Sequence, residues 1–288
     1  MFVSRFAAEY FQKRYDVYVL NRNTKPQCAG VTLIEGDRHN LKNRLSKQHF
    51  DVILDITAYD AQDVTDLLNS VGSFDDYILI SSSAVYPETA KQPFLEEIDV
   101  GPNRIWGKYG TDKIEAERTL LERVPNGYIL RPPYLYGPGN NVYREAFVFD
   151  CAMENRAFYL PGNGEMRLQF FHVEDLCRFI ERILEVHPSQ HIFNVGNENL
   201  ISIRDWVSLC YEIAGKQAAF ISVSREVEQR KYFPFYDYEY NLDVQKQCAL
   251  LPERKSLRDG LQESFAWYRK NKELVNKKPL LRYIEEAL

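Results

Sequence analysis

The sequence predicts an α/β fold in which a parallel β-sheet is covered by helices on both faces. Short apolar runs of strand length, such as residues 77–80, alternate along the chain with segments of helical periodicity, such as residues 113–121. These runs are continuous and do not alternate apolar with polar residues, a pattern typical of strands buried on both faces. Strands that alternate with helices indicate βαβ units and therefore a parallel sheet.

The individual elements follow in chain order. Apolar side chains recur at helical spacing from residue 2 to residue 11, so the sequence opens inside a helix. We expect strands at 17–20, 32–35, 52–55, 77–80 and 128–130, with helices at 63–68 and 113–121. Further along we expect helices at 143–155, 173–186, 202–214, 256–270 and 279–287, and strands at 192–196 and 220–223.

This layout predicts two lobes. Residues 1–134, together with about 169–197, form the sheet domain, and residues 135–168 and 198–288 form a smaller substrate lobe. Clefts between such lobes are common ligand sites.

Composition narrows the class of protein. With 45% hydrophobic and 27% charged residues the chain is globular, and 36 basic against 41 acidic residues give a net charge of −5. Nucleic acid is therefore an unlikely partner, because no excess positive charge attracts phosphates. The five cysteines form no CxxC pair, and no apolar run approaches the roughly 20 residues of a membrane-spanning helix. We expect a soluble, cytoplasmic protein.

A polar cluster follows the fourth predicted strand, where ligands bind in such sheets. Ser82 lies in this cluster, and Tyr109 and Lys113 follow four residues apart on one face of the next helix. A nearby ammonium favours phenolate over phenol and lowers the pKa of the tyrosine, while a serine hydroxyl orients the reacting oxygen. A second Tyr-x-x-x-Lys match at Tyr268 and Lys272 has no strand-end serine nearby, so we interpret it as solvated surface.

The order of the motifs is more specific than any one of them. The segments are Ser-Ser-Ser-Ala-Val-Tyr at 81–86, Tyr109-x-x-x-Lys113, Leu-Arg-Pro-Pro-Tyr-Leu-Tyr-Gly-Pro-Gly at 130–139, Phe-His-Val-Glu-Asp-Leu at 171–176 and Phe-Asn-Val-Gly at 193–196. This series resembles the extended short-chain dehydrogenase/reductase superfamily in its NAD-dependent epimerase/dehydratase branch. The resemblance implies a Rossmann-type doubly wound sheet and an enzyme that uses NAD or NADP.

The same resemblance implies roles for the site residues. Tyr109 would act as acid/base, Lys113 would lower its pKa and hold the nicotinamide ribose, and Ser82 would bind the reacting oxygen. The substrate would be a nucleotide sugar contacted by Ser83, Tyr134 and Arg167, with the arginine on a nucleotide phosphate.

The reaction type has one sequence clue. Dehydratases of this branch usually carry an Asp-Glu pair where this chain has Ser83 and Ala84. Dehydration is therefore disfavoured, and epimerisation or simple oxidoreduction is expected. Members of the family commonly form homodimers through two helices.

The chain departs from the family pattern at its start. The family begins with a strand and a glycine-rich turn that binds pyrophosphate, and neither is found here. Either a start codon is placed too far downstream or the chain is truncated, or the protein is shortened and its cofactor binding is impaired. We expect a sheet that lacks a central strand and leaves its neighbours with unpaired backbone groups.

Cofactor contacts are expected after the predicted strands. Arg22 would accept a 2′-phosphate and favour NADP, or stack on adenine, or have no role; these alternatives stay open. Asp37 resembles the family's adenine contact, Thr57 and Ala58 match the wall of the cofactor site, and Pro132 follows the fifth strand.

Other features suggest different chemistry. His172 is expected to pack or to cap a helix, and no metal is predicted. The aromatic stretch 232–240 either forms core or stacks on a base or sugar. Segments 55–60 and 169–172 look like the chloroplast stem-loop-binding, RNA-associated offshoot of the fold, so an RNA-binding or regulatory function is the alternative. A reductase acting on a small carbonyl compound is a third possibility.

Overall fold

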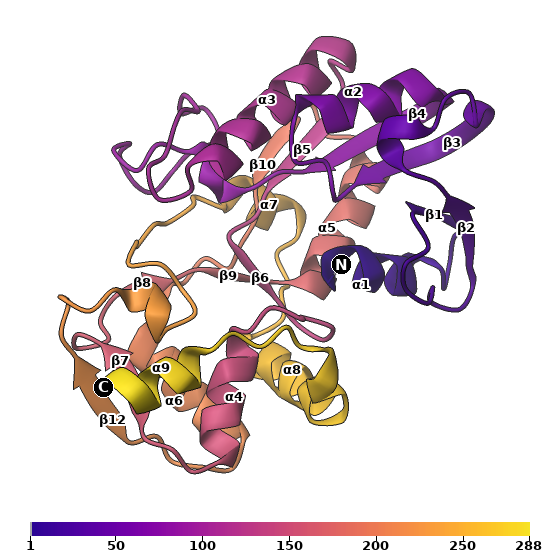
Figure 1. Cartoon of the computed structure of the whole chain (residues 1–288). Coiled ribbons are helices and arrows are strands. Elements are labelled where there is room, and N and C mark those ends of the chain that lie inside the picture. The colour runs from indigo at the N-terminus through magenta and orange to yellow at the C-terminus, as the bar shows by residue number, and fades with distance from the viewer. Residues whose placement is uncertain (1) are drawn as a thin grey trace.

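The computed structural model describes residues 2–288 and shows a large lobe built on a parallel sheet (Figure 1). Four strands lie in the order β10 (Ile192–Asn194), β5 (Tyr128–Arg131), β4 (Val71–Ile80) and β3 (Leu45–Asp55). All three pairings are parallel, so the carboxyl ends of these strands meet at one edge. The Rossmann-type α/β fold predicted from the sequence is confirmed.

Helices cover both faces of this sheet. On one face lie α2 (Ala61–Ser70) and α3 (Lys108–Arg123), and on the other lie α1 (Phe2–Phe11) and α5 (Val173–Val186). Successive residues of a strand point to opposite faces, which explains why the core strands contain continuous apolar runs.

Strands β4 and β5 show this alternation. Leu79 and Ile129 pack with the α2 and α3 side, while Ile78, Ile80 and Leu130 pack with the α5 side. All five are at most 4% exposed, so these two strands form the interior of the large lobe.

Strands β1 (Val17–Asn21) and β2 (Val31–Glu35) form a separate two-stranded parallel sheet. Neither pairs with β3, which is an edge of the four-stranded sheet, although the ring of Tyr18 lies 5.8 Å from that of Phe50. A single sheet containing all the predicted strands is therefore not found among residues 2–288.

The smaller lobe is less regular. Two further parallel pairs are β6 (Tyr134–Tyr136) with β9 (Phe170–His172), and β7 (Phe158–Pro161) with β12 (Phe220–Val223). The remaining elements are α4 (Glu145–Met153), α6 (Ile203–Ile213), α7 (Gln245–Leu250), α8 (Leu257–Asn271), α9 (Leu280–Ala287) and the short pair β8 (Arg167–Leu168) and β11 (Ile201–Ser202). A large aromatic core, which includes most of the stretch 232–240, holds this lobe together.

Most of the predicted elements are found within a few residues of their expected bounds. The sequence analysis missed the strands β6, β7, β8, β9 and β11, because strands of two to four residues carry no periodic signal, and it also missed the six-residue helix α7. It was wrong about Tyr268, which is 1% exposed and donates a hydrogen bond from its hydroxyl to Asp150. Among residues 2–288, no helix combines the length and apolar character that crossing a bilayer requires.

Candidate active site

The serine cluster lies at the carboxyl end of β4, as predicted. The backbone leaves the strand at Ser81, and the side chain of Ser82 caps a short 3-10 helix, η2 (Ser83–Val85), by accepting a hydrogen bond from the amide of Ala84 at 3.2 Å. This cap fixes the Ser82 hydroxyl at the open edge of the sheet.

Helix α3 approaches this serine closely because of a glycine. A Cβ atom at Gly110 would lie 2.5 Å from the carbonyl oxygen of Ala84, so only glycine fits there without a backbone shift. The neighbouring Tyr109 is thereby brought beside Ser82, whose side chain interacts with the phenol. Ser82 thus lies near enough to Tyr109 to act on the pKa of its phenol.

Lys113 is buried beneath the same edge. Its Nζ donates to the carbonyl oxygens of Ala58 at 2.7 Å and Ile80 at 2.9 Å, which are backbone groups just beyond β3 and at the end of β4. Burial lowers the pKa of Lys113 to about 8, although the nearby carboxylates of Asp55 and Glu117 act in the opposite direction. The ammonium is held in place by the ends of two neighbouring strands.

The electrostatics of Tyr109 differ from the expectation. Its pKa is raised, mainly because burial of the phenol disfavours the phenolate; Ser82 and the more distant Arg144 act to lower it. The expected fall in pKa is therefore absent in the protein alone: Lys113 is not among the groups that act on the phenol, and its ammonium donates to backbone carbonyls. Tyr109 as it stands holds its proton.

Tyr59 is a neighbour that the sequence analysis missed. Its ring lies 5.2 Å from Nζ of Lys113 and 6.5 Å from the ring of Tyr109, and 55% of the residue is exposed. The ring covers the open side of the ammonium. Its place directly after Ala58 was the only available sequence signal.

A buried ion pair supports the site from below. Arg131, at the end of β5, pairs with Glu117 of α3 at 2.6 Å, and both side chains are 4% exposed. Glu117 also accepts a hydrogen bond from Ser81, and Arg131 donates to the hydroxyl of Tyr86 at 2.8 Å. The network ties α3, β4 and β5 together one turn beyond Lys113.

The predicted substrate contacts lie on the side of the small lobe. Ser83 is buried and its side chain interacts with the phenol of Tyr240, which neighbours Tyr134 at a ring distance of 5.9 Å. Arg167 lies elsewhere, on the exposed edge of the small lobe, where Glu239 holds its guanidinium at 2.6 Å. The structure thus brings Ser83 and Tyr134 together around Tyr240, which was not predicted, and leaves Arg167 in an ion pair.

The predicted cofactor residues divide into two groups. Ala58 is fully buried and its carbonyl accepts from Lys113, and the carbonyl of Pro132 accepts from the amide of Ser83 at 3.0 Å, so both lie at the carboxyl edge of the sheet. Asp37 caps a short 3-10 helix, η1 (Arg38–Asn40), while Arg22 is exposed after β1.

Arg38, which the sequence analysis missed, lies between these groups. Its guanidinium binds both carboxylate oxygens of Asp55, at 2.7 and 3.2 Å, and reaches the hydroxyl of Thr57 at 3.4 Å. Its only sequence signal was its place next to Asp37.

His172 has the structural role that was expected. It is fully buried and its Nδ1 accepts the amide of Glu174 at 3.3 Å, which caps α5. Burial lowers its pKa to about 3, so the ring stays neutral.

A parallel sheet whose carboxyl edge presents serine, tyrosine and lysine defines a class of nucleotide-dependent enzymes with short-chain dehydrogenase architecture. The sequence model of the NAD dependent epimerase/dehydratase family matches residues 2–196. The chain belongs to this family.

Curated relatives have varied functions. The chain is 28% identical over 242 residues to a chloroplast stem-loop binding protein of 41 kDa from Arabidopsis thaliana, an alignment that covers 81% of this chain. It is 26% identical to GDP-L-fucose synthase 1 from the same plant, over 67% of this chain. The chain spans 63% of the length of each of these relatives.

Solved structures share the fold. The dTDP-glucose 4,6-dehydratase of Bacillus anthracis in complex with NAD has a TM-score of 0.74 at 19% identity, with 97% of this chain and 96% of the other covered. The UDP-glucuronic acid 4-epimerase of Bacillus cereus, with UDP-glucuronic acid and NAD, has a TM-score of 0.71 at 20% identity, covering 93% and 96%.

Proposed function

We propose that the chain carries the active site of an NAD(P)-dependent epimerase or reductase that acts on a nucleotide sugar. One observation carries this proposal: the hydroxyl of Ser82 lies beside the phenol of Tyr109, one helical turn from the buried Lys113, at the carboxyl edge of the sheet. The relatives that are nucleotide-sugar enzymes support the substrate class.

The residues at this edge fit the nicotinamide half of the cofactor. Nζ of Lys113 has three N–H groups, two of which bind carbonyls, so the third can turn from the ring of Tyr59 to a ribose hydroxyl. Ala58 supplies a flat, buried wall. The sequence holds no Gly-x-x-Gly-x-x-Gly motif, so we assign no residues to the diphosphate.

The proton chemistry then follows from the positions of the side chains. NAD or NADP, held at this edge by Lys113 and Ala58, would supply a nicotinamide that can accept and return hydride. Oη of Tyr109, protonated as the protein stands, would give its proton to a keto oxygen as hydride reaches the keto carbon. The resulting phenolate would take the proton back when a sugar hydroxyl is oxidised, while Oγ of Ser82 holds the same oxygen in line. In the proposed enzyme, the ammonium of Lys113 would supply the positive charge that offsets the raised pKa of Tyr109 once its third N–H group turns toward the site.

The test compares the Tyr109→Phe variant with the wild type. The measured quantity is the turnover rate of UDP- and GDP-linked sugars in the presence of NAD or NADP. We expect a loss of about 10²- to 10⁴-fold, the usual contribution of a positioned acid/base, with nucleotide-sugar binding retained. Tyr15→Phe, which changes an exposed tyrosine at the end of α1, is the matched control. Full turnover in Tyr109→Phe contradicts the proposal.

RNA binding is the second candidate, and the chloroplast stem-loop binding relative favours it. The net charge of −5 opposes it. Titration of the protein with a stem-loop RNA at two salt concentrations decides: salt-dependent binding supports this candidate, and no binding removes it.

We also propose that the protein is a cytoplasmic homodimer. All five cysteines are free, which suits a reducing compartment, and α2 and α3 lie side by side on one face of the sheet, where two copies can form a four-helix bundle. A monomeric mass in sedimentation equilibrium contradicts the dimer.

A further inference from the structure

Two largely buried carboxylates hold the loop that follows β3 by its backbone. Oδ1 of Asp55, the last residue of β3, accepts hydrogen bonds from the amides of Thr57 at 3.3 Å and Ala58 at 3.0 Å. Oδ2 of Asp63, in the first turn of α2, accepts from the amide of Tyr59 at 2.7 Å. We call these two residues the acid pair. Three successive amides are fixed by the acid pair, so the conformation of the loop depends on where its carboxylates lie.

This loop in turn holds Lys113, and residues 57–59 are therefore called the Lys113 loop. The carbonyl of Ala58 accepts from Nζ of Lys113 at 2.7 Å, and the ring of Tyr59 lies 5.2 Å from the same nitrogen. The second acceptor, the carbonyl of Ile80, ends a buried strand and is fixed by the sheet. A shift of the loop would thus move one acceptor of the ammonium and leave the other in place.

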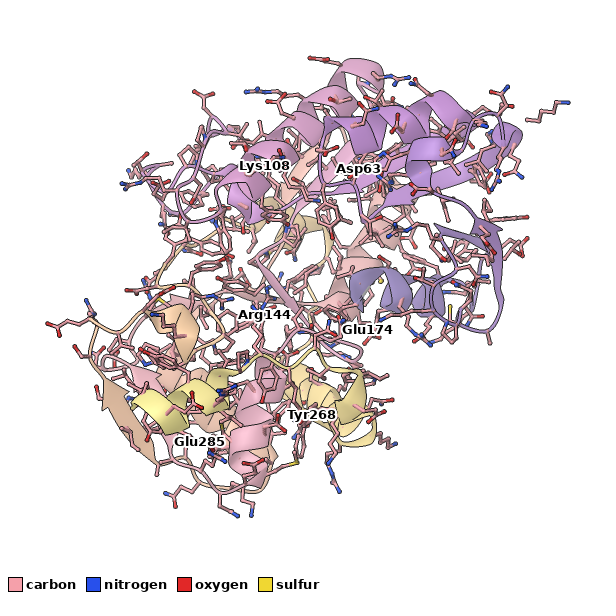
Figure 2. The ribbon with its side chains drawn as sticks, viewed as in Figure 1. Asp63, Lys108, Arg144, Glu174, Tyr268 and Glu285 are labelled. Carbon is pink, nitrogen blue, oxygen red and sulfur yellow. The ribbon has the colours of Figure 1, made fainter. Side chains whose placement is uncertain are left out.

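One arginine joins the two members of the acid pair. The guanidinium of Arg38, in η1, binds both oxygens of Asp55 at 2.7 and 3.2 Å, and its Nη1 lies 3.8 Å from Oδ1 of Asp63. Figure 2 shows Asp63 in the large lobe, level with Lys108, the first residue of α3. Two largely buried anions beside one guanidinium depend on that cation, because like charges repel strongly away from water.

Two further groups contact the acid pair singly. The hydroxyl of Tyr77 donates to Oδ2 of Asp55 at 2.7 Å, and Nε2 of His39 lies 3.3 Å from Oδ1 of Asp63. Of these three partners, only Arg38 contacts both acids. Its guanidinium therefore fixes the two acceptors of the loop amides relative to one another.

We propose that Arg38 is a positioning residue for Lys113: it holds the acid pair, the acid pair holds the Lys113 loop, and the loop sets the direction of the ammonium. For its effect on turnover this role rests on the proposed function, whereas the coupling itself does not. Arg38 directly follows Asp37, the residue expected at the adenine of the cofactor, which caps the same short helix. The coupling therefore connects the adenine end of the predicted cofactor site to its nicotinamide end.

The first test measures hydrogen exchange of the Lys113 loop by mass spectrometry, without cofactor. In Arg38→Gln the acid pair loses its shared cation. We expect the loop amides to exchange about 10- to 100-fold faster, as for a lost hydrogen bond between charged groups. Amides of β4 and β5 should keep their wild-type rates. Arg44→Gln is the matched control, because Arg44 follows the same short helix but is exposed and donates to a backbone carbonyl, that of Glu35.

Competitive acetylation with acetic anhydride, followed peptide by peptide, reports on Lys113 itself. Rates are compared on the plateau above the pKa of this lysine, because the charge of Arg38 lowers that pKa while the acid pair raises it. We expect Lys113 to be acetylated about 10-fold faster in Arg38→Gln, and the exposed Lys108 at an unchanged rate. Arg38→Lys keeps the charge but loses the two-pronged contact, so its rate should lie between those of Arg38→Gln and the wild type.

Turnover separates positioning from support of the fold. In the proposed enzyme the ammonium offsets the raised pKa of Tyr109, so a displaced ammonium slows proton transfer. At saturating cofactor, Arg38→Gln should lower kcat about 10-fold or more and leave KM for the nucleotide sugar within about 2-fold of the wild type.

The coupling and the proposed function can fail separately. Wild-type exchange of the Lys113 loop, or wild-type acetylation of Lys113, in folded Arg38→Gln and Arg38→Lys overturns the proposal. Equally faster exchange in β4 and β5 also overturns it, because the effect of Arg38 is then global. An unchanged kcat in an active enzyme contradicts the positioning role. If the wild type turns over no nucleotide sugar, the proposed function fails, and exchange and acetylation still decide the coupling.

Discussion

The two parallel sheets of the large lobe differ in how firmly their carboxyl ends are held. In the four-stranded sheet, the ends of β4 and β5 are joined to α3 by the Lys113 hydrogen bonds and the Arg131–Glu117 pair. In the two-stranded sheet, each residue of β1 and β2 is exposed or only partly buried. Arg22, after β1, is exposed, and Glu35 ends β2 on the surface.

This difference separates two halves of the predicted site. Lys113 is fixed by buried hydrogen bonds to two strand ends, and Ser82 is held by its cap on η2; neither set of contacts involves β1 or β2. Arg22 and Asp37, the residues expected near the adenosine of the cofactor, follow the strands of the two-stranded sheet β1–β2. An isolated pair of strands is only marginally stable. In the proposed enzyme, the first half would carry the proton chemistry and the second would contribute to cofactor affinity.

The largest expected effect tests the buried pair. Glu117→Ala leaves the guanidinium of Arg131 buried without its carboxylate, and we expect a loss of about 3–5 kcal/mol in the free energy of unfolding. Urea denaturation followed by circular dichroism measures it.

The matched control lies in the other sheet. Glu35→Ala removes an exposed carboxylate that accepts from the side chain of Asn23 at 2.9 Å, and we expect a change of at most about 1 kcal/mol. Equal losses in the two variants would show that the two sheets are equally important for stability.

A second prediction concerns Lys113 and pH. Its folded pKa of about 8 lies below the unfolded value near 10.5, so between these pH values the unfolded chain binds more protons and the stability contribution of this residue rises with pH. Relative to Lys113→Met, the wild type should gain about 3 kcal/mol between pH 8 and pH 10.5.

Lys108 on the same helix is the control for this titration. It is exposed, and Asp112 raises its pKa, so Lys108→Met should show no such gain in this interval. A flat difference between the wild type and Lys113→Met would mean that the Lys113 ammonium is not desolvated.

The sequence predicted the parts of the site that depend on local order along the chain. Ser82, Tyr109 and Lys113 follow a strand and open a helix, and continuous apolar runs together with helical periodicity determine both features. The raised pKa of Tyr109 was not predictable, because it depends on burial by residues distant in sequence.

The smallest expected effect is the most direct comparison of the two sheets. Hydrogen exchange followed by mass spectrometry should show faster exchange for amides of β1 and β2 than for those of β4 and β5, since residues that pack loosely open locally at low cost. The exchange rate of strand β10 shows whether fast exchange comes from an edge position or from membership of the two-stranded sheet. It is also an edge strand, but Phe193 is 1% exposed and the strand pairs with β5. If amides of β10 exchange as fast as those of β1, the edge position alone explains the difference. If β10 is protected like β5, the low local stability is a property of the two-stranded sheet and of the adenine half of the proposed cofactor site.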